Sequence, residues 1–183
     1  MITFRPLARP DLPILQRWLN TPHIYEWWGR HSSPGSLGGT GPNAATEAQV
    51  EAKYGPTIDH GGTTQRFIIE HAGVPIGLIQ WYHLRDFSDY ARAIGEEPAA
   101  TAGIDLLIGE PGVVGQGLST RAVNEFVRTV VFRRTEVDRV VAGPAATNAR
   151  SIRVFEKAGF HRIRLASIDG EPIPEAVLLR TKP

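Results

Sequence analysis

The sequence predicts one domain, residues 1–183, of the α+β (α/β) class: a mixed β-sheet flanked by helices. Three observations predict this class. Short runs rich in β-branched and aromatic residues recur along the whole chain, and amphipathic helical patterns stand between them. Two pairs of these runs are joined by short glycine-containing turns, which predicts antiparallel hairpins, whereas the remaining runs are separated by helices. The expected order of elements is β-α-α-β-β-β-α-β-α-β-β.

The N-terminal third opens with a short strand at 2–7. A helix follows at 9–20, where leucines and a tryptophan recur at helical spacing. An aromatic cluster at 23–29 marks the end of a helix. Residues 30–45 are rich in glycine, serine and proline and are interpreted as a mobile loop. A second helix is expected from Thr46, which is a residue type that caps helix N-termini.

The middle of the chain contains the first predicted hairpin, with strands at 65–72 and 74–84. The polar segment 85–101 is expected to be irregular. An apolar strand at 100–109 comes next, and a long amphipathic helix is predicted over 118–132.

The C-terminal part begins with a strand at 137–143. A helix is expected over 147–158, ended by Gly159 in a left-handed conformation. The runs 160–168 and 173–181, separated by a turn, predict the second hairpin.

Composition restricts the class of protein. The chain is 42% hydrophobic and 21% charged with a net charge of +1, so its overall charge indicates neither nucleic acid nor a membrane as a partner. It has no cysteine, which excludes disulfides and thiol nucleophiles, and its six histidines lack ligand spacing, so no metal is expected. We find no signal-peptide pattern and no apolar run near 20 residues, and therefore expect a cytoplasmic protein.

A glycine-rich stretch, GVVGQG at 112–117, lies between a predicted strand and a predicted helix. Backbone N–H groups and the helix dipole can hold a phosphate at such a place. Gly115 and Gly117 would allow close approach and can adopt positive φ. The stretch matches neither a Walker A loop nor a dinucleotide fingerprint. By itself it predicts a phosphate site and a purely structural turn equally well.

A second motif decides between these readings. The segment NARSIRVFEKAGF, 148–160, resembles the characteristic helix of the Gcn5-related N-acetyltransferase (GNAT) superfamily, whose acetyl-CoA loop lies one helix and one strand earlier, as GVVGQG does here. The resemblance implies the GNAT fold, in which two parallel strands, here about 103–109 and 138–142, splay apart to admit acetyl-CoA.

The family's aminoglycoside 6′-N-acetyltransferases provide a closer resemblance. It is carried by HIYEWWG at 23–29, PIGLIQWY at 75–82 and GIDLLIG at 103–109. It implies transfer of an acetyl group from acetyl-CoA to the 6′-amine of a polycationic aminoglycoside, and hence antibiotic resistance. Related siderophore and lysine N-acyltransferases also carry a tryptophan-rich segment like the first of these.

The resemblance implies two sets of site residues. The residues expected at acetyl-CoA are Leu107 through its backbone, the loop residues Gly115, Gln116, Gly117, Leu118, Ser119 and Thr120, and Asn148 and Phe155. The residues expected at the acceptor are Trp27, Trp28, Gln80, Tyr82, Asp105 and Asp169. Trp28 is equally compatible with a place in the core. Asp169 is better explained as part of a hairpin turn with Gly170.

Asp105 has the strongest functional signal, because a lone carboxylate in an apolar strand is costly unless it is paired or useful. An amine is protonated at neutral pH and must lose a proton before it attacks a thioester. A nearby carboxylate can orient it and accept that proton, directly or through one water. A backbone N–H of the same strand would polarise the thioester oxygen. We also expect the acidic segment 86–110 to form a rim that attracts cations.

Two residues depart from the family pattern. Phe155 stands where relatives usually have a tyrosine that protonates the leaving thiolate, so water must supply that proton. Gly143 stands where the aminoglycoside enzymes have an acid before a proline, so one expected amine contact is missing. Two alternatives therefore stay open: acylation of another small amine, such as a lysine-derived siderophore precursor, and a non-catalytic CoA-binding module.

Overall fold

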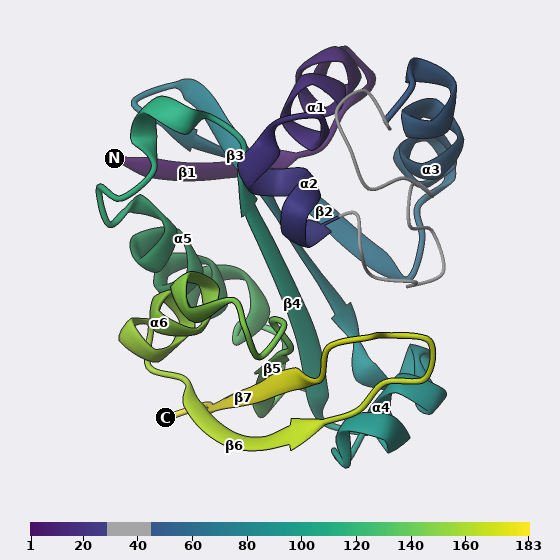
Figure 1. Ribbon diagram of the computed structural model, residues 1–183, viewed down its shortest axis with the longest axis vertical. Coiled ribbons are helices and arrows are strands. Elements are labelled where there is room, and N and C mark those ends of the chain that lie inside the picture. The colour runs from purple at the N-terminus through teal and green to yellow at the C-terminus, as the bar shows by residue number, and fades with distance from the viewer. Residues whose placement is uncertain (29–44) are drawn as a thin grey trace. The chain divides into compact units, whose positions relative to one another are not determined.

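The computed structural model describes residues 1–28 and 45–183, so the predicted loop at 30–45 lies almost wholly outside the described residues. Seven strands form one sheet in the order β1-β2-β3-β4-β5-β7-β6 (Figure 1). Strand β4 pairs in parallel with β5, while β1–β2, β5–β7 and β6–β7 are antiparallel, which confirms the mixed sheet. The strands are β1 (Ile2–Pro6), β2 (Thr64–His71), β3 (Val74–His83), β4 (Thr101–Ile108), β5 (Arg139–Ala142), β6 (His161–Ala166) and β7 (Glu175–Thr181).

The chain forms two compact units. One comprises Met1–Ile79 and Leu106–Val114, and the other Gln80–Asp105 and Gly115–Pro183. Strands β3 and β4 each contribute residues to both units. That the whole chain is a single domain remains a prediction.

The first unit contains helices α1 (Leu12–Leu19), α2 (Pro22–Trp28) and α3 (Glu47–His60). The predicted N-cap at Thr46 is confirmed: its side chain accepts a hydrogen bond from the backbone N–H of Gln49, while the Gln49 side chain accepts one from the Thr46 N–H. This reciprocal box satisfies two amides that a helix start leaves without partners. The core of the unit surrounds Trp18 and Tyr54, both fully buried.

The Gly109-Glu110-Pro111 segment after β4 has a structural explanation in this unit. A Cβ on Gly109 would lie 2.0 Å from Cγ of Trp18, so only glycine fits beneath the indole. The Trp18 Nε1–H donates to Glu110 at 2.8 Å, and Arg17 forms an ion pair with the same carboxylate. Glu110 therefore anchors the first helix and does not belong to an acidic rim.

The second unit contains α4 (Ser88–Ile94), α5 (Leu118–Phe126) and α6 (Ala149–Lys157). Helices α5 and α6 lie side by side (Figure 1). The long helix predicted over 118–132 ends its α-helical part at Phe126 and continues as a π-helical turn, Val127–Val131. Gly159 has φ 87°, which confirms the left-handed cap after α6.

Helix α4 corrects the prediction of an irregular segment at 85–101. It has only seven residues, and its inward side is made by Ala91 and Ile94, which are buried. Two apolar positions in a polar segment give too little periodicity to predict a helix. Gly95, with φ 68°, ends α4 as a left-handed cap.

Within 1–28 and 45–183, no helix combines the length and the apolar character needed to cross a membrane. The same residues include no group of three or more His, Cys, Asp or Glu side chains arranged to hold a metal ion.

Candidate active site

The predicted phosphate loop lies at the start of α5. Gly115 (φ 87°) and Gly117 (φ 77°) both adopt the left-handed conformation, and Gly117 is the N-cap residue of the helix. A Cβ on either glycine would meet no heavy atom within 4 Å, so both face open space. The first backbone N–H groups of α5 have no intrahelical acceptor by position. The loop therefore offers donors and room, as a pyrophosphate requires.

The other residues of this loop differ in exposure. Gln116 is exposed, Ser119 and Thr120 are half-buried, and Leu118 is buried in the core of the second unit. The Leu118 side chain is thus a packing residue, and its contribution to a ligand is limited to its backbone N–H.

A polar patch lies on one face of β3 and β4. Gln80 and Tyr82 are two residues apart on β3, as are Gly103 and Asp105 on β4, so each pair shares a face of its strand. The Gln80 Nε2–H donates to Oδ2 of Asp105 at 2.8 Å. This hydrogen bond orients the carboxylate that the sequence singles out.

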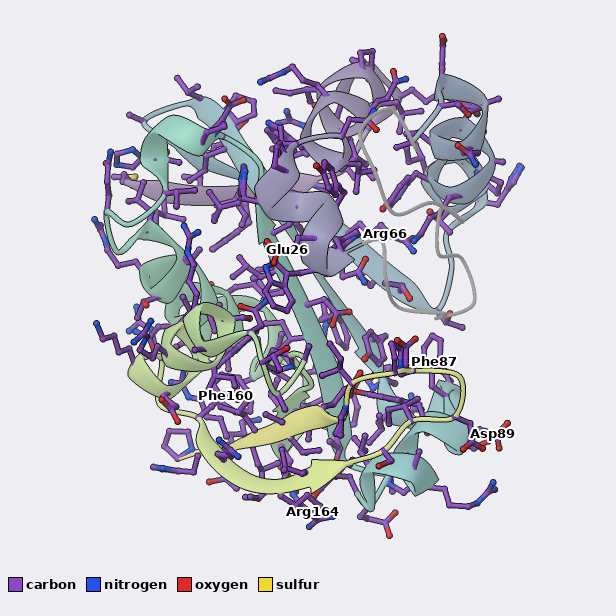
Figure 2. The ribbon with its side chains drawn as sticks, viewed as in Figure 1. Glu26, Arg66, Phe87, Asp89, Phe160 and Arg164 are labelled. Carbon is purple, nitrogen blue, oxygen red and sulfur yellow. The ribbon has the colours of Figure 1, made fainter. Side chains whose placement is uncertain are left out.

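Gly103 of the GID motif makes room for Tyr82. A Cβ on Gly103 would lie 2.2 Å from Cζ and 2.5 Å from the hydroxyl oxygen of Tyr82, so the ring lies directly over the glycine. The Tyr82 ring also packs edge-on against Phe87, with ring centroids 4.8 Å apart. Phe87, labelled in Figure 2, immediately precedes α4.

Two further polar residues belong to this patch. Tyr90 of α4 donates its hydroxyl hydrogen to Oε2 of Glu175 at 2.8 Å, and Glu175 is buried at the first position of β7. The pKa of Glu175 is raised to about 7, chiefly by burial and also by the charge of Asp105, against the lowering effect of the Tyr90 hydrogen bond. Glu175 and Asp105 are therefore close enough to interact electrostatically.

The two tyrosines of the patch are neutral phenols. Burial, followed by the charges of Asp105 and Glu175, raises the pKa of Tyr82 well above its usual value. Burial also raises the pKa of Tyr90, as do its neighbours Tyr82 and Glu175. Both phenols thus remain protonated at neutral pH, which leaves the carboxylates as the bases of the patch.

The predicted tryptophans lie in the first unit, at the C-terminal end of α2. Trp27 and Trp28 are both half-buried, and Trp28 packs against the core cluster that contains Trp18 and Tyr54. The core interpretation of Trp28 thus has support, and a contact with the acceptor remains a prediction. Leu107, in the same unit, has its side chain buried in that core, so only its backbone is available to a ligand.

Asn148 and Phe155 have structural roles in α6. Asn148 is the N-cap residue, and its Oδ1 accepts a hydrogen bond from the Ser151 N–H at 3.0 Å. Phe155 is 3% exposed and packs edge-on against Phe160, with ring centroids 5.3 Å apart. Asp169 is exposed in the turn between β6 and β7, next to Gly170 with φ 83°. Contacts of these three residues with substrates remain predictions.

The acidic segment 86–110 does not form a continuous rim. Glu96 is buried and pairs with Arg139 at 2.5 Å and Arg164 at 3.2 Å, so it is a structural ion pair. Asp89 is exposed on the outer side of α4, where it pairs with Arg92 (Figure 2). Asp105 is the member of this segment that lies in the polar patch.

Sequence reasoning missed Glu175 and Tyr90. Glu175 carried the signal that identified Asp105, a lone acid beside an apolar run, in IPEAVLLRT. The sequence placed Glu175 inside the predicted strand 173–181, but no local pattern connected it with Asp105. Tyr90 lay in the segment that was expected to be irregular.

Comparison with known protein families decides the class of the protein. The model of the acetyltransferase (GNAT) domain matches residues 8–168. The chain belongs to the GNAT acetyltransferase family. The predicted fold and the prediction of an acyl-transferring enzyme are thereby confirmed, and the second motif, 148–160, lies within the matched region.

Relatives of this GNAT acetyltransferase include aminoglycoside enzymes. The aminoglycoside N(6')-acetyltransferase type 1 of Klebsiella pneumoniae is 32% identical over 161 residues, which are 88% of this chain and 74% of that protein. The structure of AAC(6')-Ib in complex with ribostamycin and coenzyme A has a TM-score of 0.78 at 28% identity, covering 99% of this chain and 93% of that one. The same enzyme in complex with coenzyme A and kanamycin has a TM-score of 0.76 at 28% identity, with coverage of 100% and 95%.

Proposed function

We propose that this GNAT acetyltransferase transfers the acetyl group of acetyl-CoA to the 6′-amine of an aminoglycoside. The observation that carries the proposal is the position of Asp105 in the GID motif, on a face shared with Gly103 and oriented by Gln80. The aminoglycoside relatives at 28–32% identity support the choice of acceptor. The absence of cysteine suits a reducing cytoplasm, which is the compartment we propose.

The proposed reaction is direct transfer. Asp105 binds the 6′-ammonium and accepts its proton, directly or through one water. The free amine nitrogen then attacks the thioester carbonyl, a C–N bond forms, and the oxyanion is stabilised by a backbone N–H. The C–S bond breaks as the amide forms. The CoA thiolate takes a proton from water, since Phe155 has no hydroxyl to give.

The residues proposed to hold acetyl-CoA are those of the loop and the start of α5. Gly115 and Gly117 provide the open approach, and the N–H groups of Leu118, Ser119 and Thr120 are the donors for the pyrophosphate. Gln116 and the backbone of Leu107 complete this proposed set, with Asn148 and Phe155 from the resemblance.

The acceptor contacts are also proposed. Gln80 and Tyr82 would meet the sugar beside Asp105, since they share its polar patch. Trp27 and Trp28 would provide apolar walls. Asp169 is retained only on the family resemblance.

The test is turnover with two acceptors, followed by release of free CoA thiol. Kanamycin should be acetylated at its 6′-amine, and an aminoglycoside with a 6′-hydroxyl in place of that amine should not react. Asp105→Asn keeps the size of the side chain but removes its basicity, so kcat/KM for kanamycin should fall by roughly 10²–10⁴ while KM for acetyl-CoA is unchanged.

Asp138→Asn is the matched control, because Asp138 is exposed immediately before β5. It should retain full activity. Failure of the wild-type protein to acetylate kanamycin, with turnover of a lysine-derived hydroxylamine instead, would replace the aminoglycoside by a siderophore precursor. No turnover with either, despite acetyl-CoA binding, would favour a non-catalytic module.

A further inference from the structure

Glu175 is a buried carboxylate whose partners do not balance its charge. It is 8% exposed, and its hydrogen-bond partner is the neutral hydroxyl of Tyr90. Among the residues that the structure describes, no lysine, arginine or histidine forms an ion pair with it. A buried carboxylate without a cation is costly. Glu175 must therefore either hold a proton or receive a cation from outside the described chain.

The position of Glu175 is fixed by backbone pairing with the segment that follows β5. The Ala176 N–H donates to the Pro144 carbonyl and the Ala146 N–H to the Pro174 carbonyl, both at 2.8 Å. Ala145 and Glu175 form an isolated antiparallel bridge. Glu175 is thus held beside Gly143 by main-chain hydrogen bonds.

The Glu175 carboxylate occupies the space that a side chain at position 143 would need. A Cβ on Gly143 would lie 2.2 Å from Oε2 of Glu175 and 2.5 Å from the hydroxyl oxygen of Tyr90. The resemblance to aminoglycoside enzymes implies an acid before Pro144, where this chain has Gly143. In this chain, the carboxylate that lies beside position 143 comes from β7.

We propose that Glu175 binds a second ammonium group of the acceptor and thereby selects amines that carry at least two positive charges. Asp105 binds the reacting amine, and Glu175 holds another amine of the same molecule. The proposal rests on the proposed function for the identity of the reaction.

The ionisable groups around Glu175 explain how this contact would work. They are Tyr82 of β3, Tyr90 of α4, Asp105 of β4 and Glu171 before β7, while β6 places the uncharged Ala166 opposite Glu175. None of these is a cation, and two are acids. With its pKa raised to about 7, Glu175 holds a proton over much of the neutral range. An ammonium group beside it would favour the ionised form, so binding would release that proton.

The first test measures acceptor selectivity in Glu175→Gln. Glutamine keeps the shape, and its carbonyl can still accept from Tyr90. The KM for kanamycin should rise at least tenfold, whereas kcat/KM for 6-amino-6-deoxyglucose, which carries a single amine, and KM for acetyl-CoA should stay within about twofold. Glu156→Gln, an exposed change on α6, is the matched control and should change none of these. Equal losses for both acceptors would overturn the proposal, as would an unchanged KM for kanamycin.

The second test needs no turnover. Calorimetric titration of kanamycin in two buffers of different ionisation enthalpy gives the number of protons exchanged on binding. At pH 6.5, a group with pKa about 7 is roughly three-quarters protonated, so the wild-type protein should release about 0.7 more protons per kanamycin than Glu175→Gln. Equal proton numbers would overturn the proposal. If wild-type protein binds kanamycin with this proton release but does not acetylate it, the proposed function fails and the cation contact stands.

A rescue variant separates charge from packing. Glu175→Ala combined with Gly143→Asp returns a carboxylate from the neighbouring strand, and Gly143 has an ordinary backbone conformation that accepts a side chain. After removal of Glu175, the Tyr90 hydroxyl would still have to move aside. The double variant should recover at least part of the kanamycin affinity that Glu175→Ala loses. A folded double variant with no recovery at all would indicate that Glu175 acts through packing and would refute the proposed contact.

Discussion

Replacement of Glu175 by glutamine should stabilise the protein at alkaline pH. The pKa of the folded carboxyl is raised from 4.5 to about 7, so between these values the folded state holds a proton that the unfolded state has lost. The free energy of unfolding of the wild-type protein therefore falls as pH rises through this range. A rise of about 2.5 in pKa corresponds to about 3 kcal/mol, of which roughly 2.5 kcal/mol is lost between pH 5 and pH 8.

The glutamine variant has no such proton to lose. Its stability relative to wild type should therefore increase by about 2.5 kcal/mol from pH 5 to pH 8, which for a chain of this size is roughly 5–10 °C in Tm. Urea unfolding at both pH values measures this change, with Glu156→Gln as the control that should show no pH-dependent difference. A relative stability that is the same at pH 5 and pH 8 would mean that Glu175 is already ionised in the folded protein. A variant that is more stable yet binds kanamycin more weakly would be typical of a residue kept for function.

Three further substitutions test the loop, α6 and the GID motif. Gly117→Ala should raise KM for acetyl-CoA about tenfold. Gly170→Ala is the control, because it introduces the same left-handed strain of about 1 kcal/mol in an open turn, and it should lower only the Tm. Equal KM values in the two variants would remove the phosphate role of the loop. Phe155→Tyr should leave kcat within about threefold if water protonates the thiolate, and a large loss together with lost acetyl-CoA binding would identify a pure packing residue. Gly103→Ala should displace the Tyr82 ring. It should lower the unfolding free energy by about 1–3 kcal/mol and reduce kcat/KM at least tenfold. A variant with wild-type stability and activity would contradict the contact between Gly103 and Tyr82.

Local interactions made much of the fold predictable from the sequence. The capping box at Thr46 and the left-handed Gly159 involve residues within a few positions of each other, so the sequence contains both partners. The apolar periodicity of the strands and of α5 has the same local origin. Helix α4 escaped prediction because its formation depends on burying Ala91 and Ile94 against distant parts of the second unit.

The candidate site likewise combines features that the sequence predicts with features that only the tertiary structure shows. The loop glycines and the lone acid Asp105 were visible in the sequence, since unusual residue types in a regular pattern are a local signal. The Gln80–Asp105 hydrogen bond joins residues 25 positions apart, and the Tyr90–Glu175 bond joins residues 85 positions apart. The sequence alone suggested that one carboxylate was missing at Gly143. Only the tertiary structure shows that the Glu175 carboxylate of β7 lies beside Gly143. The two residues are far apart in the sequence, and they come together because the strand segments that contain them pair.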